Sequence, residues 1–196
     1  PRDGDVCTQV FTVVDARDEL LISGVNYGEN LGADVTVSGT VGAALQGAVS
    51  GVPALAVSLQ TPKETHYNPS DGVDFSAAIH FTRYFSRWVL SADLPFDVDV
   101  LKIDVPDDAT PATPWRLTRI SRRSYFVPTA SSPEEREMGA KPIGYMSHPD
   151  PSRVEPDSDI YAFAIDRVVS VSPVSLDLTA RVHLGELEAS LYRSSD

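Results

Sequence analysis

Two short apolar runs, separated by a segment of small apolar residues, constrain the fold more than any other feature of the chain. The first run, Glu19–Ser23, ends at Gly24, and the second, Pro53–Leu59, is followed closely by Pro62. Runs of this length between glycine and proline predict buried β-strands. Between them Thr40–Ser50, rich in Ala, Val, Leu and Gly, predicts a short buried helix. A strand, helix, strand unit of this kind indicates a parallel sheet.

A second helix and a third strand follow along the chain. Apolar residues recur at helical spacing in Asp71–Leu90, and Ser70 or Asp71 can cap the start of that helix. Val98–Val105 alternates apolar with charged residues and is ended by Pro106. We therefore predict a strand that lies near an edge of the sheet or has one face toward solvent.

From residue 107 onward the pattern changes to short alternating runs and a long segment without periodicity. We expect strands at Trp115–Ile120, Tyr125–Val127, Ile160–Ile165 and Val168–Val171 (ended by Pro173), a loop at Pro128–Pro156 and a terminal helix at Leu184–Tyr192. The predicted fold class is α/β. Residues 1–106 form a core with a Rossmann-like parallel sheet and helices on both faces, and residues 107–196 form a β-rich C-terminal appendage.

Charge and cysteine usage limit the classes of function. The net charge of −12, from 16 basic and 28 acidic side chains, repels polyphosphates and argues against a surface that coats nucleic acid. An anionic substrate must therefore be bound locally, by a helix N-terminus, backbone N–H groups or a bound cation. The single Cys7 permits no internal disulfide and no cysteine zinc site, which fits a reducing, cytoplasmic compartment.

Two other segments bear on where the protein resides. No charged side chain occurs between Asp34 and Lys63, but Ser, Thr and Gly are frequent there and Pro53 interrupts the stretch, so we predict no membrane span. The chain starts at Pro1, without Met and without the apolar core of a signal peptide. We expect it to begin inside a longer natural sequence.

The segment after the first predicted strand carries the chemistry. Ligands bind in open parallel sheets where strand C-termini and helix N-termini converge. Asn26 and Asn30 lie there, and their side chains offer carbonyl oxygens for a hard cation and amide donors for phosphate oxygens. Ser38, Gly39 and Thr40 then present hydroxyl and backbone N–H groups at a helix start, where Ser38 or Thr40 can also act as the cap. Together they predict an anion site.

Three motifs in register resemble the SurE family of 5'/3'-nucleotidases. Ser23–Asn30 is similar to the family's Ser-Gly-Ile-Asn-x-Gly-x-Asn element, Ser38–Ala44 to its Ser-Gly-Thr-Val-x-Ala-Ala helix start, and Gly51–Ser58 to its Gly-x-Pro-Ala-x-Ala-x-Ser strand. More loosely, Leu101–Pro106 is similar to the Asn-Val-Asn-x-Pro segment, Arg116–Tyr125 to a threonine-arginine strand, and Ser170–Pro173 with Leu176–Thr179 to a closing signature. The resemblance spans nearly the whole chain.

The resemblance implies a metal-dependent phosphomonoesterase that hydrolyses nucleoside 5'/3'-monophosphates. It implies Mg²⁺ or Mn²⁺ held by an N-terminal Asp-Asp pair, a Ser and the Asn that Asn26 matches. The substrate phosphate would lie near Asn30, Ser38, Gly39 and Thr40. It also implies a homodimer or homotetramer, assembled through an extended β-hairpin within residues 116–145 and an exchanged C-terminal tail after residue 179.

The sequence departs from the family at the metal ligands, because no Thr-Asn-Asp-Asp-Gly element precedes Ser23. The catalytic carboxylates are therefore not among these residues. Asp107 and Asp108 follow Pro106 in a predicted surface loop, which is a poor position for a replacement. Without two carboxylates a hard cation receives too little charge compensation, so a non-catalytic binding or assembly module is the alternative. A serine hydrolase is disfavoured because the chain has no Gly-x-Ser-x-Gly elbow.

Overall fold

The computed structural model describes residues 10–15, 18–62, 65, 72–130, 133, 137, 143–147 and 149–193. Its strands are β1 (Val10–Asp15), β2 (Asp18–Tyr27), β3 (Ala54–Leu59), β4 (Val100–Val105), β5 (Trp115–Leu117), β6 (Val127–Ala130), β7 (Ile143–Met146) and β8 (Val169–Val174). Its helices are η1 (Ala33–Val37), α1 (Gly39–Val49), α2 (Ser76–Ser91), the π-helical turn η3 (Tyr161–Ile165) and α4 (Leu184–Arg193).

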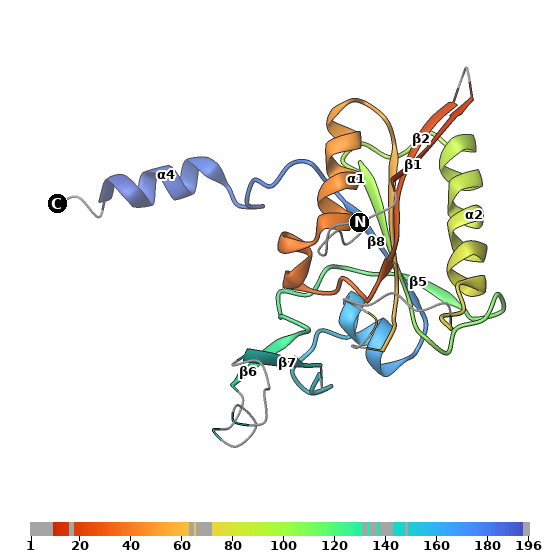
Figure 1. Ribbon diagram of the computed structural model, residues 1–196. Helices are drawn as coiled ribbons and strands as arrows, with labels where there is room; N and C mark the ends of the chain where they lie inside the picture. Colours follow the sequence, from red (N-terminus) through yellow and green to blue (C-terminus); the bar gives the residue numbers. More distant parts are fainter. Residues whose placement is uncertain are drawn as a thin grey trace.

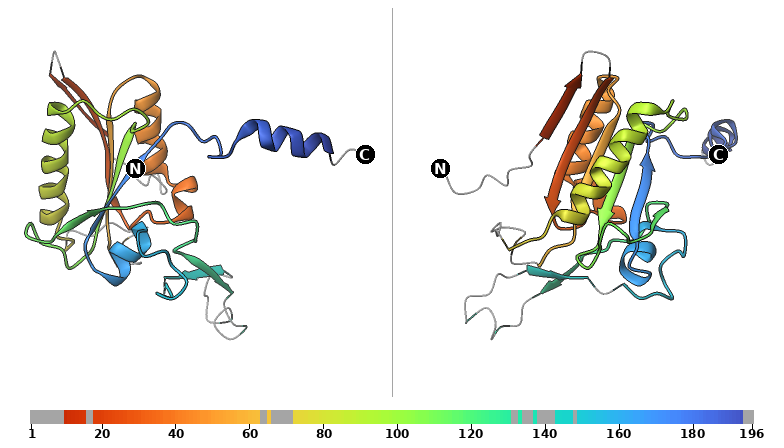
Figure 2. Two further views of the ribbon diagram at one scale, coloured as in Figure 1. Left: turned by 180° about the vertical axis from the view of Figure 1, so that it is seen from behind. Right: turned by 90° about the vertical axis from the view of Figure 1, so that its right-hand side faces the viewer.

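One mixed sheet organises the molecule. Its strand order is β1-β2-β3-β4-β8-β5, and β2, β3 and β4 run parallel to one another. Strand β1 is antiparallel to β2, and β8 is antiparallel to β4. Figure 1 shows α1 and α2 on opposite faces of this sheet, and the turned views of Figure 2 agree. The predicted α/β class with helices on both faces is confirmed.

Strand β3 explains how the two helices pack. Every residue of β3 is buried, as a strand covered on both faces requires. Leu55 and Val57 belong to the core on the α2 side, whereas Ala56 belongs to the core on the α1 side. Small residues on that second face let α1 approach closely. A Cβ atom added at Gly47 of α1 would lie 2.5 Å from Leu21 Cδ1, so α1 contacts β2 without room for a side chain.

The position predicted for the third strand is wrong. Strand β4 lies between β3 and β8, and all six of its residues are buried. Lys102 and Asp104, which suggested a solvent-facing side, are instead paired with each other inside the protein, with 2.5 Å between Lys102 Nζ and Asp104 Oδ2. Opposite charges two residues apart on one strand face can neutralise each other, and the alternation of charged and apolar residues then no longer indicates exposure.

Two other strand predictions need correction. Residues 160–165, predicted as a strand, are helical, and the turn η3 (Tyr161–Ile165) packs Phe163 into a small core with Leu31 and Tyr125. Strand β8 does not stop at Pro173 but continues to Val174. The β5 strand pairs with β8 only as far as Val171, so Pro173 stands where β8 has no neighbour on that side and its missing N–H is tolerated.

The second helix begins later than predicted. It starts at Ser76, where the Asp74 carboxylate accepts hydrogen bonds from the Ser76 backbone N–H at 2.8 Å and from its hydroxyl at 3.0 Å. The predicted caps Ser70 and Asp71 lie outside the described residues. The N-cap position is Phe75, whose side chain makes no capping hydrogen bond, so the Asp74 carboxylate is the acceptor that the structure places at this helix start.

The C-terminal part contributes to the main sheet and also extends from it. Strands β5 and β8 complete the sheet, whereas β6 and β7 form a separate two-stranded hairpin. The predicted terminal helix is confirmed as α4, which projects away from the body (Figures 1 and 2). The division at residue 106 stays a prediction. Among the residues that the structure describes, no helix is long and apolar enough to cross a membrane.

Candidate active site

The parallel strands bring their C-terminal ends to one edge of the sheet. Tyr27, Leu59 and Val105 end β2, β3 and β4, and backbone hydrogen bonds join the residues that follow: Gly28 N to Leu59 O at 2.8 Å and Gln60 N to Val105 O at 2.8 Å. Helix α1 begins at this same edge, next to η1 (Figure 1). The predicted convergence of strand C-termini with a helix N-terminus is present in the structure.

Asn26 lies at the end of β2 and is held by a local contact. Its Nδ2 donates to the carbonyl of Gly28 at 2.8 Å, which leaves its side-chain oxygen for a ligand. Ser23 is fully buried on the same strand, and its hydroxyl oxygen has no hydrogen-bond partner. A Cβ at Gly24, where φ is +125°, would lie 2.3 Å from the Val57 carbonyl oxygen, so only glycine fits between these two residues and β3.

Asn30 is held at three points, two of them on its own backbone. Its backbone N–H donates to Asp104 Oδ1 at 2.8 Å, and its carbonyl accepts from Lys102 Nζ at 2.9 Å. Its side-chain Nδ2 donates to Ser58 Oγ at 2.7 Å. We call residues 26–32 the asparagine loop. Asn30, the predicted phosphate-binding residue of this loop, is thus fixed by contacts with β3 and β4 rather than by contacts within the loop.

The charges behind the asparagine loop form a buried triad of Lys102, Asp104 and Asp159. Lys102 Nζ lies 2.5 Å from Asp104 and 3.1 Å from Asp159, and all three side chains are at most 1% exposed. Burial on its own would lower the pKa of Lys102, but the two carboxylates outweigh it and raise the pKa above its usual value. Lys102 therefore stays charged inside the protein.

The predicted anion site lies at the start of α1. Ser38 is its N-cap, and its hydroxyl oxygen accepts from the Val41 backbone N–H at 3.2 Å. Gly39 is exposed, and no atom lies within 4 Å of the place where its Cβ would be. Thr40 is buried. The open face of this helix end is therefore at Gly39, where free N–H groups and the helix dipole favour an anion.

Glu29 adds a buried carboxyl group to the asparagine loop. It is 6% exposed, and its Oε2 has no hydrogen-bond partner. Burial raises the pKa of Glu29 to about 7, to which the nearby charge of Asp104 adds. Glu29 also contacts Tyr125, whose pKa is raised by burial and by the carboxyl charge. This pair joins the asparagine loop to the segment that leads into the β6–β7 hairpin.

The same segment is tied to the site by backbone contacts. The Asp34 carboxylate accepts from the N–H groups of both Tyr125 and Phe126 at 2.9 Å. Gly32, with φ of +57°, forms a bridge with Ser124, and Ala33 N donates to Arg123 O at 2.9 Å. A side chain at Gly32 would meet that carbonyl. The base of the hairpin is therefore part of the wall of the site.

The metal-ligating part of the site is incomplete in the described residues. Among them no three His, Cys, Asp or Glu side chains are grouped so that they could hold a metal ion. Asn26 and Ser23 supply only neutral oxygens, which alone do not fit the charge demand of Mg²⁺ or Mn²⁺. Asp107 and Asp108 are exposed and both pair with Arg167, at 2.5 and 2.6 Å. Their carboxylates are thus already paired with the Arg167 guanidinium group.

Several residues that shape the site were missed by sequence reasoning. They are Glu29, Ser58, Lys102, Asp104 and Asp159. The available signal was a lysine and an aspartate inside the apolar run Val100–Val105, which predicts either an exposed face or a buried ion pair. Local sequence cannot separate these, because the partner Asp159 is distant along the chain.

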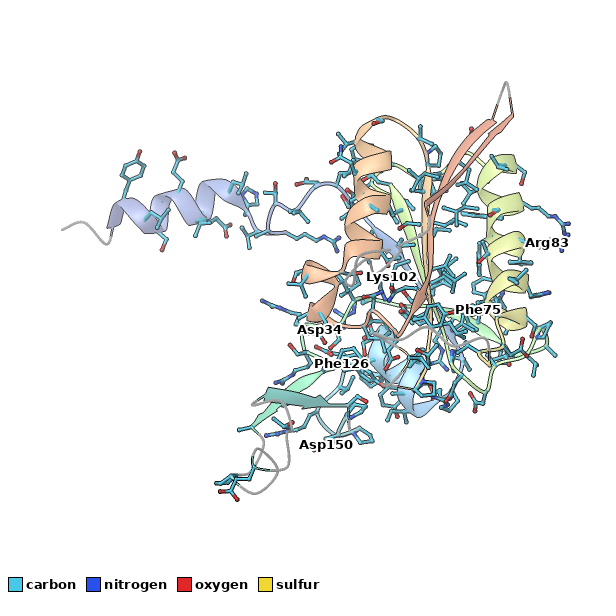
Figure 3. All side chains as sticks on the ribbon, in the orientation of Figure 1. Asp34, Phe75, Arg83, Lys102, Phe126 and Asp150 are labelled. Atoms are coloured by element: carbon cyan, nitrogen blue, oxygen red, sulfur yellow. The ribbon has the colours of Figure 1, made fainter. Side chains whose placement is uncertain are left out.

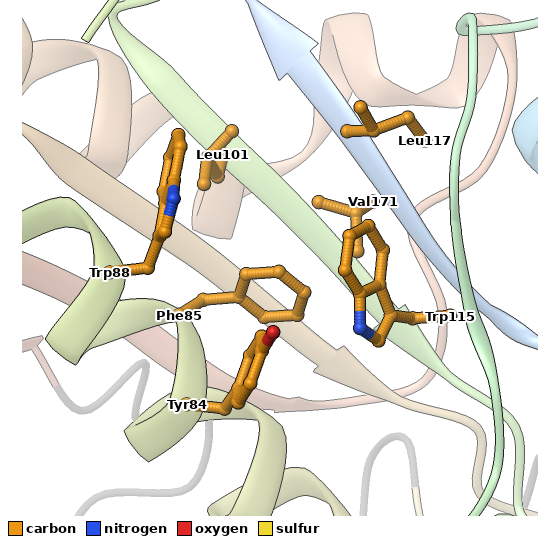
Figure 4. Close-up of a pocket in the computed structure, with 7 residues that line it drawn as sticks. All are labelled: Tyr84, Phe85, Trp88, Leu101, Trp115, Leu117 and Val171. Carbon is orange, nitrogen blue, oxygen red and sulfur yellow. The ribbon is translucent and has the colours of Figure 1, made fainter. Parts of the chain in front are cut away.

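A cavity lies away from this edge, on the α2 face of the sheet (Figure 4). It has a volume of about 170 Å³ and is lined by Tyr84, Phe85, Trp88, Leu101, Trp115, Leu117 and Val171. The lining has no charged side chain, so this cavity offers nothing to hold a phosphate group. The asparagine loop and the start of α1 are therefore the site to compare with known proteins.

That comparison decides the family. The family description "Survival protein SurE" matches residues 6–127. The chain belongs to the SurE family. It is 40% identical to the 5'-nucleotidase SurE of Thermococcus kodakarensis over 89% of this chain and 66% of that protein. It is 35% identical to the 5'-nucleotidase SurE of Methanosarcina mazei over 97% of this chain and 72% of that protein.

A solved structure agrees with the sequence relatives. The crystal structure of the SurE protein from Aquifex aeolicus matches with a TM-score of 0.64 and 25% identity, over 90% of this chain and 65% of that chain. This chain thus spans roughly two thirds of the length of the SurE proteins it matches. The motifs in residues 23–30, 38–44 and 51–58, which carried the resemblance, all lie within the matched range.

Proposed function

We propose that the protein is a metal-dependent phosphomonoesterase that hydrolyses nucleoside 5'- and 3'-monophosphates. The single observation that supports it best is the juxtaposition of Asn30, fixed by β3 and β4, with the open N-terminus of α1 at Gly39 at the same sheet edge. The curated relatives are named 5'-nucleotidases. Both observations favour a phosphate ester as the substrate.

The residues of this chain have definite roles in that reaction. Asn30, the Ser38 hydroxyl and the backbone N–H groups of Gly39 and Thr40 bind the phosphate and offset the charge that builds on its equatorial oxygens, whereas the Ser38 backbone N–H already donates to the Val35 carbonyl. The α1 dipole also favours the negative charge of the phosphate. Phosphate can therefore bind here without a basic patch, in a chain whose net charge is −12. A bound Mg²⁺ or Mn²⁺ would polarise the phosphoryl group. Asn26 would contribute one neutral ligand to that ion.

The remaining expectations belong to the same proposal. Helix α4 projects from the body, and its apolar side chains Leu184, Leu187 and Tyr192 are exposed. A homodimer or homotetramer that exchanges this tail would cover them, and the β6–β7 hairpin would extend the contact. Cytoplasmic location fits the single cysteine.

The test is a thermal-shift titration of the protein as its gene encodes it, with Mn²⁺, a nucleoside monophosphate, or both. An enzyme should be stabilised by each ligand, by about 2.7 kcal/mol at a ligand concentration 100 times its Kd. Release of inorganic phosphate is measured in the same samples. Indifference to both ligands with no phosphate release would refute the proposal and support a non-catalytic assembly module.

An Asn26→Ala variant tests the metal assignment. We expect the Mn²⁺-dependent thermal shift to be lost while the fold is kept, because the hydrogen bond that the Asn26 side chain makes within the described part of the chain is a local one, to Gly28. Gln46→Ala, which removes an exposed carboxamide from α1 outside the motifs, is the control and should keep the Mn²⁺-dependent shift. An unchanged Mn²⁺ affinity in Asn26→Ala would remove that residue from the site.

A further inference from the structure

The buried triad of Lys102, Asp104 and Asp159 has no role in the proposed chemistry, yet it contacts the asparagine loop directly. Lys102 lies within the body on the face of β4 that Val100 shares with α1 (Figure 3). Its Nζ reaches Asn30 O at 2.9 Å in addition to the two carboxylates. All three ammonium hydrogens thus have acceptors, and one of these acceptors is the backbone of a predicted phosphate ligand.

The two carboxylates accept hydrogen bonds from the same loop, on either side of the Asn30 carbonyl. Asp104 Oδ1 accepts from Asn30 N at 2.8 Å, and Asp159 Oδ2 accepts from Gly32 N at 2.9 Å. Asp159 Oδ1 accepts from the N–H groups of Ser121 and Ile160, both at 2.9 Å. The triad therefore binds three backbone groups within Asn30–Gly32 and anchors that segment to two other parts of the chain.

Stability alone is a weak explanation for such a cluster. Removing three charges from water is expensive, and well-packed apolar residues in place of a buried ion pair are often as stable or more so. The neighbouring positions of β4 show that apolar residues suit this strand. An apolar residue cannot donate a charged hydrogen bond to the Asn30 carbonyl. That hydrogen bond fixes the orientation of the Asn30 backbone and thereby of its side-chain carboxamide.

We propose that Lys102 is a positioning residue for phosphate binding: its ammonium group, held between Asp104 and Asp159, fixes the Asn30 backbone and thereby sets the direction of the Asn30 side chain. This rests on the proposed function. Ser58 completes the arrangement by accepting from Asn30 Nδ2 at 2.7 Å. Lys102 acts through Asn30 and does not itself touch the substrate.

The decisive variants are Lys102→Met and the double variant Lys102→Met with Asp104→Asn. The single change leaves two buried carboxylates without a cation and is expected to lower stability strongly. The natural triad has one cation and two anions and so a net charge of −1, and the double variant keeps this net charge because only Asp159 remains ionised. The Asp104→Asn change also keeps an oxygen that accepts from Asn30 N. The double variant still lacks the donor to Asn30 O. It therefore separates loop positioning from folding.

The matched control is Thr118→Val. Thr118 is 6% exposed and its hydroxyl contacts Ser170 Oγ at 2.8 Å and Ser172 Oγ at 2.9 Å, so the change disrupts a buried polar network of the same sheet. No hydrogen bond from this hydroxyl to the asparagine loop is found among the described residues. A general loss of stability should appear in this variant without a change at the site.

The first readout is competitive inhibition by inorganic phosphate in the full-length protein, at a temperature where circular dichroism shows every variant folded. We expect the inhibition constant to rise by about 10- to 100-fold in the double variant, because a misplacement of about 1 Å can cost about 100-fold. The value of kcat should fall with it, because the Asn30 amide also offsets the charge that builds on the phosphate. Thr118→Val should match the natural protein. Natural phosphate affinity in the folded double variant would overturn the proposal.

The second readout does not depend on activity. Amide hydrogen exchange of Asn30 and Gly32 should accelerate in the double variant and not in Thr118→Val. Both N–H groups keep an acceptor in the double variant, but the loop has lost the Lys102 donor to Asn30 O and should open more often. If the natural protein releases no phosphate from nucleotides, the proposed function fails, and this exchange measurement still decides whether Lys102 holds the loop. Equal exchange rates in the double variant and the natural protein would show that it does not.

Discussion

The Asp34 carboxylate accepts a hydrogen bond from the backbone N–H of Tyr125 at 2.9 Å, across a separation of 91 residues. Asp34 belongs to η1, which follows the asparagine loop, and Tyr125 precedes the β6–β7 hairpin. The same carboxylate oxygen accepts from Phe126. One side chain near the start of α1 thus fixes the path by which the chain leaves the site toward the hairpin.

Replacing that carboxylate should loosen the hairpin base. Asp34→Ala removes the acceptor of two N–H groups, each bond to a charged group being worth about 1.5–3 kcal/mol at most. We expect faster amide exchange at Tyr125 and Phe126 and a lower free energy of unfolding in urea. Asp34→Asn, which keeps an acceptor oxygen, should lie between the alanine variant and the natural protein. Exchange rates that do not change in Asp34→Ala would show that the backbone holds this segment without Asp34.

Glu29 should make stability depend on pH in an unusual direction. Its pKa is about 7 in the folded protein against an ordinary value of 4.5. Between pH 4.5 and about pH 7, the folded state therefore keeps a proton that the unfolded state has lost. The free energy of unfolding therefore falls as pH rises through this window. The total fall is about 3 kcal/mol, since each pKa unit corresponds to about 1.4 kcal/mol.

A Glu29→Gln variant tests this contribution. The amide stays neutral, so the fall attributable to Glu29 should disappear and the variant should exceed the natural protein in stability at pH 8. Glu186→Gln, at an exposed position of α4, is the control and should leave the pH profile unchanged. Urea denaturation at pH 5, 6, 7 and 8 measures the difference. Parallel profiles for Glu29→Gln and the natural protein would contradict the prediction.

Two glycines should respond oppositely to alanine. At Gly32, where φ is +57°, a Cβ would lie 2.1 Å from the Arg123 carbonyl oxygen, so backbone strain and a clash add together. At Gly42, inside α1, nothing lies within 4 Å of the added atom. Gly42→Ala should stabilise the protein by up to about 1 kcal/mol through helix propensity. Gly32→Ala should destabilise it by more than that and weaken phosphate binding, as thermal denaturation and phosphate inhibition will show.

Ser38 has a structural and a predicted chemical role, and two variants separate them. Ser38→Ala removes the acceptor for the Val41 N–H and should cost about 1 kcal/mol of stability. Ser38→Asp keeps a capping oxygen, so its stability should be close to that of the natural protein. The added negative charge beside the phosphate should nevertheless abolish nucleotide hydrolysis. Full activity in Ser38→Asp would place the substrate phosphate elsewhere.

The candidate site was predictable where its residues are contiguous in the sequence. Ser23–Asn30 and Ser38–Thr40 each follow a short apolar run or begin a helix, and the alternation of strand, helix and strand places both at one edge of a parallel sheet. Their individual roles toward metal and phosphate stay predictions. The strand at residues 160–165 and the edge position of β4 were wrong, because both depend on which distant segments cover those residues.

The sequence by itself determined the α/β class, the glycine-bounded asparagine loop and the capped start of α1, because these depend on residues within one or two turns or strands of each other. Only the tertiary structure decided that Lys102 and Asp104 are buried and that Asp159 completes their charge balance. A charged residue in an apolar strand is tolerable only beside its counter-charge. That partner comes from a segment 55 residues further along the chain than Asp104, which folding alone brings to the asparagine loop.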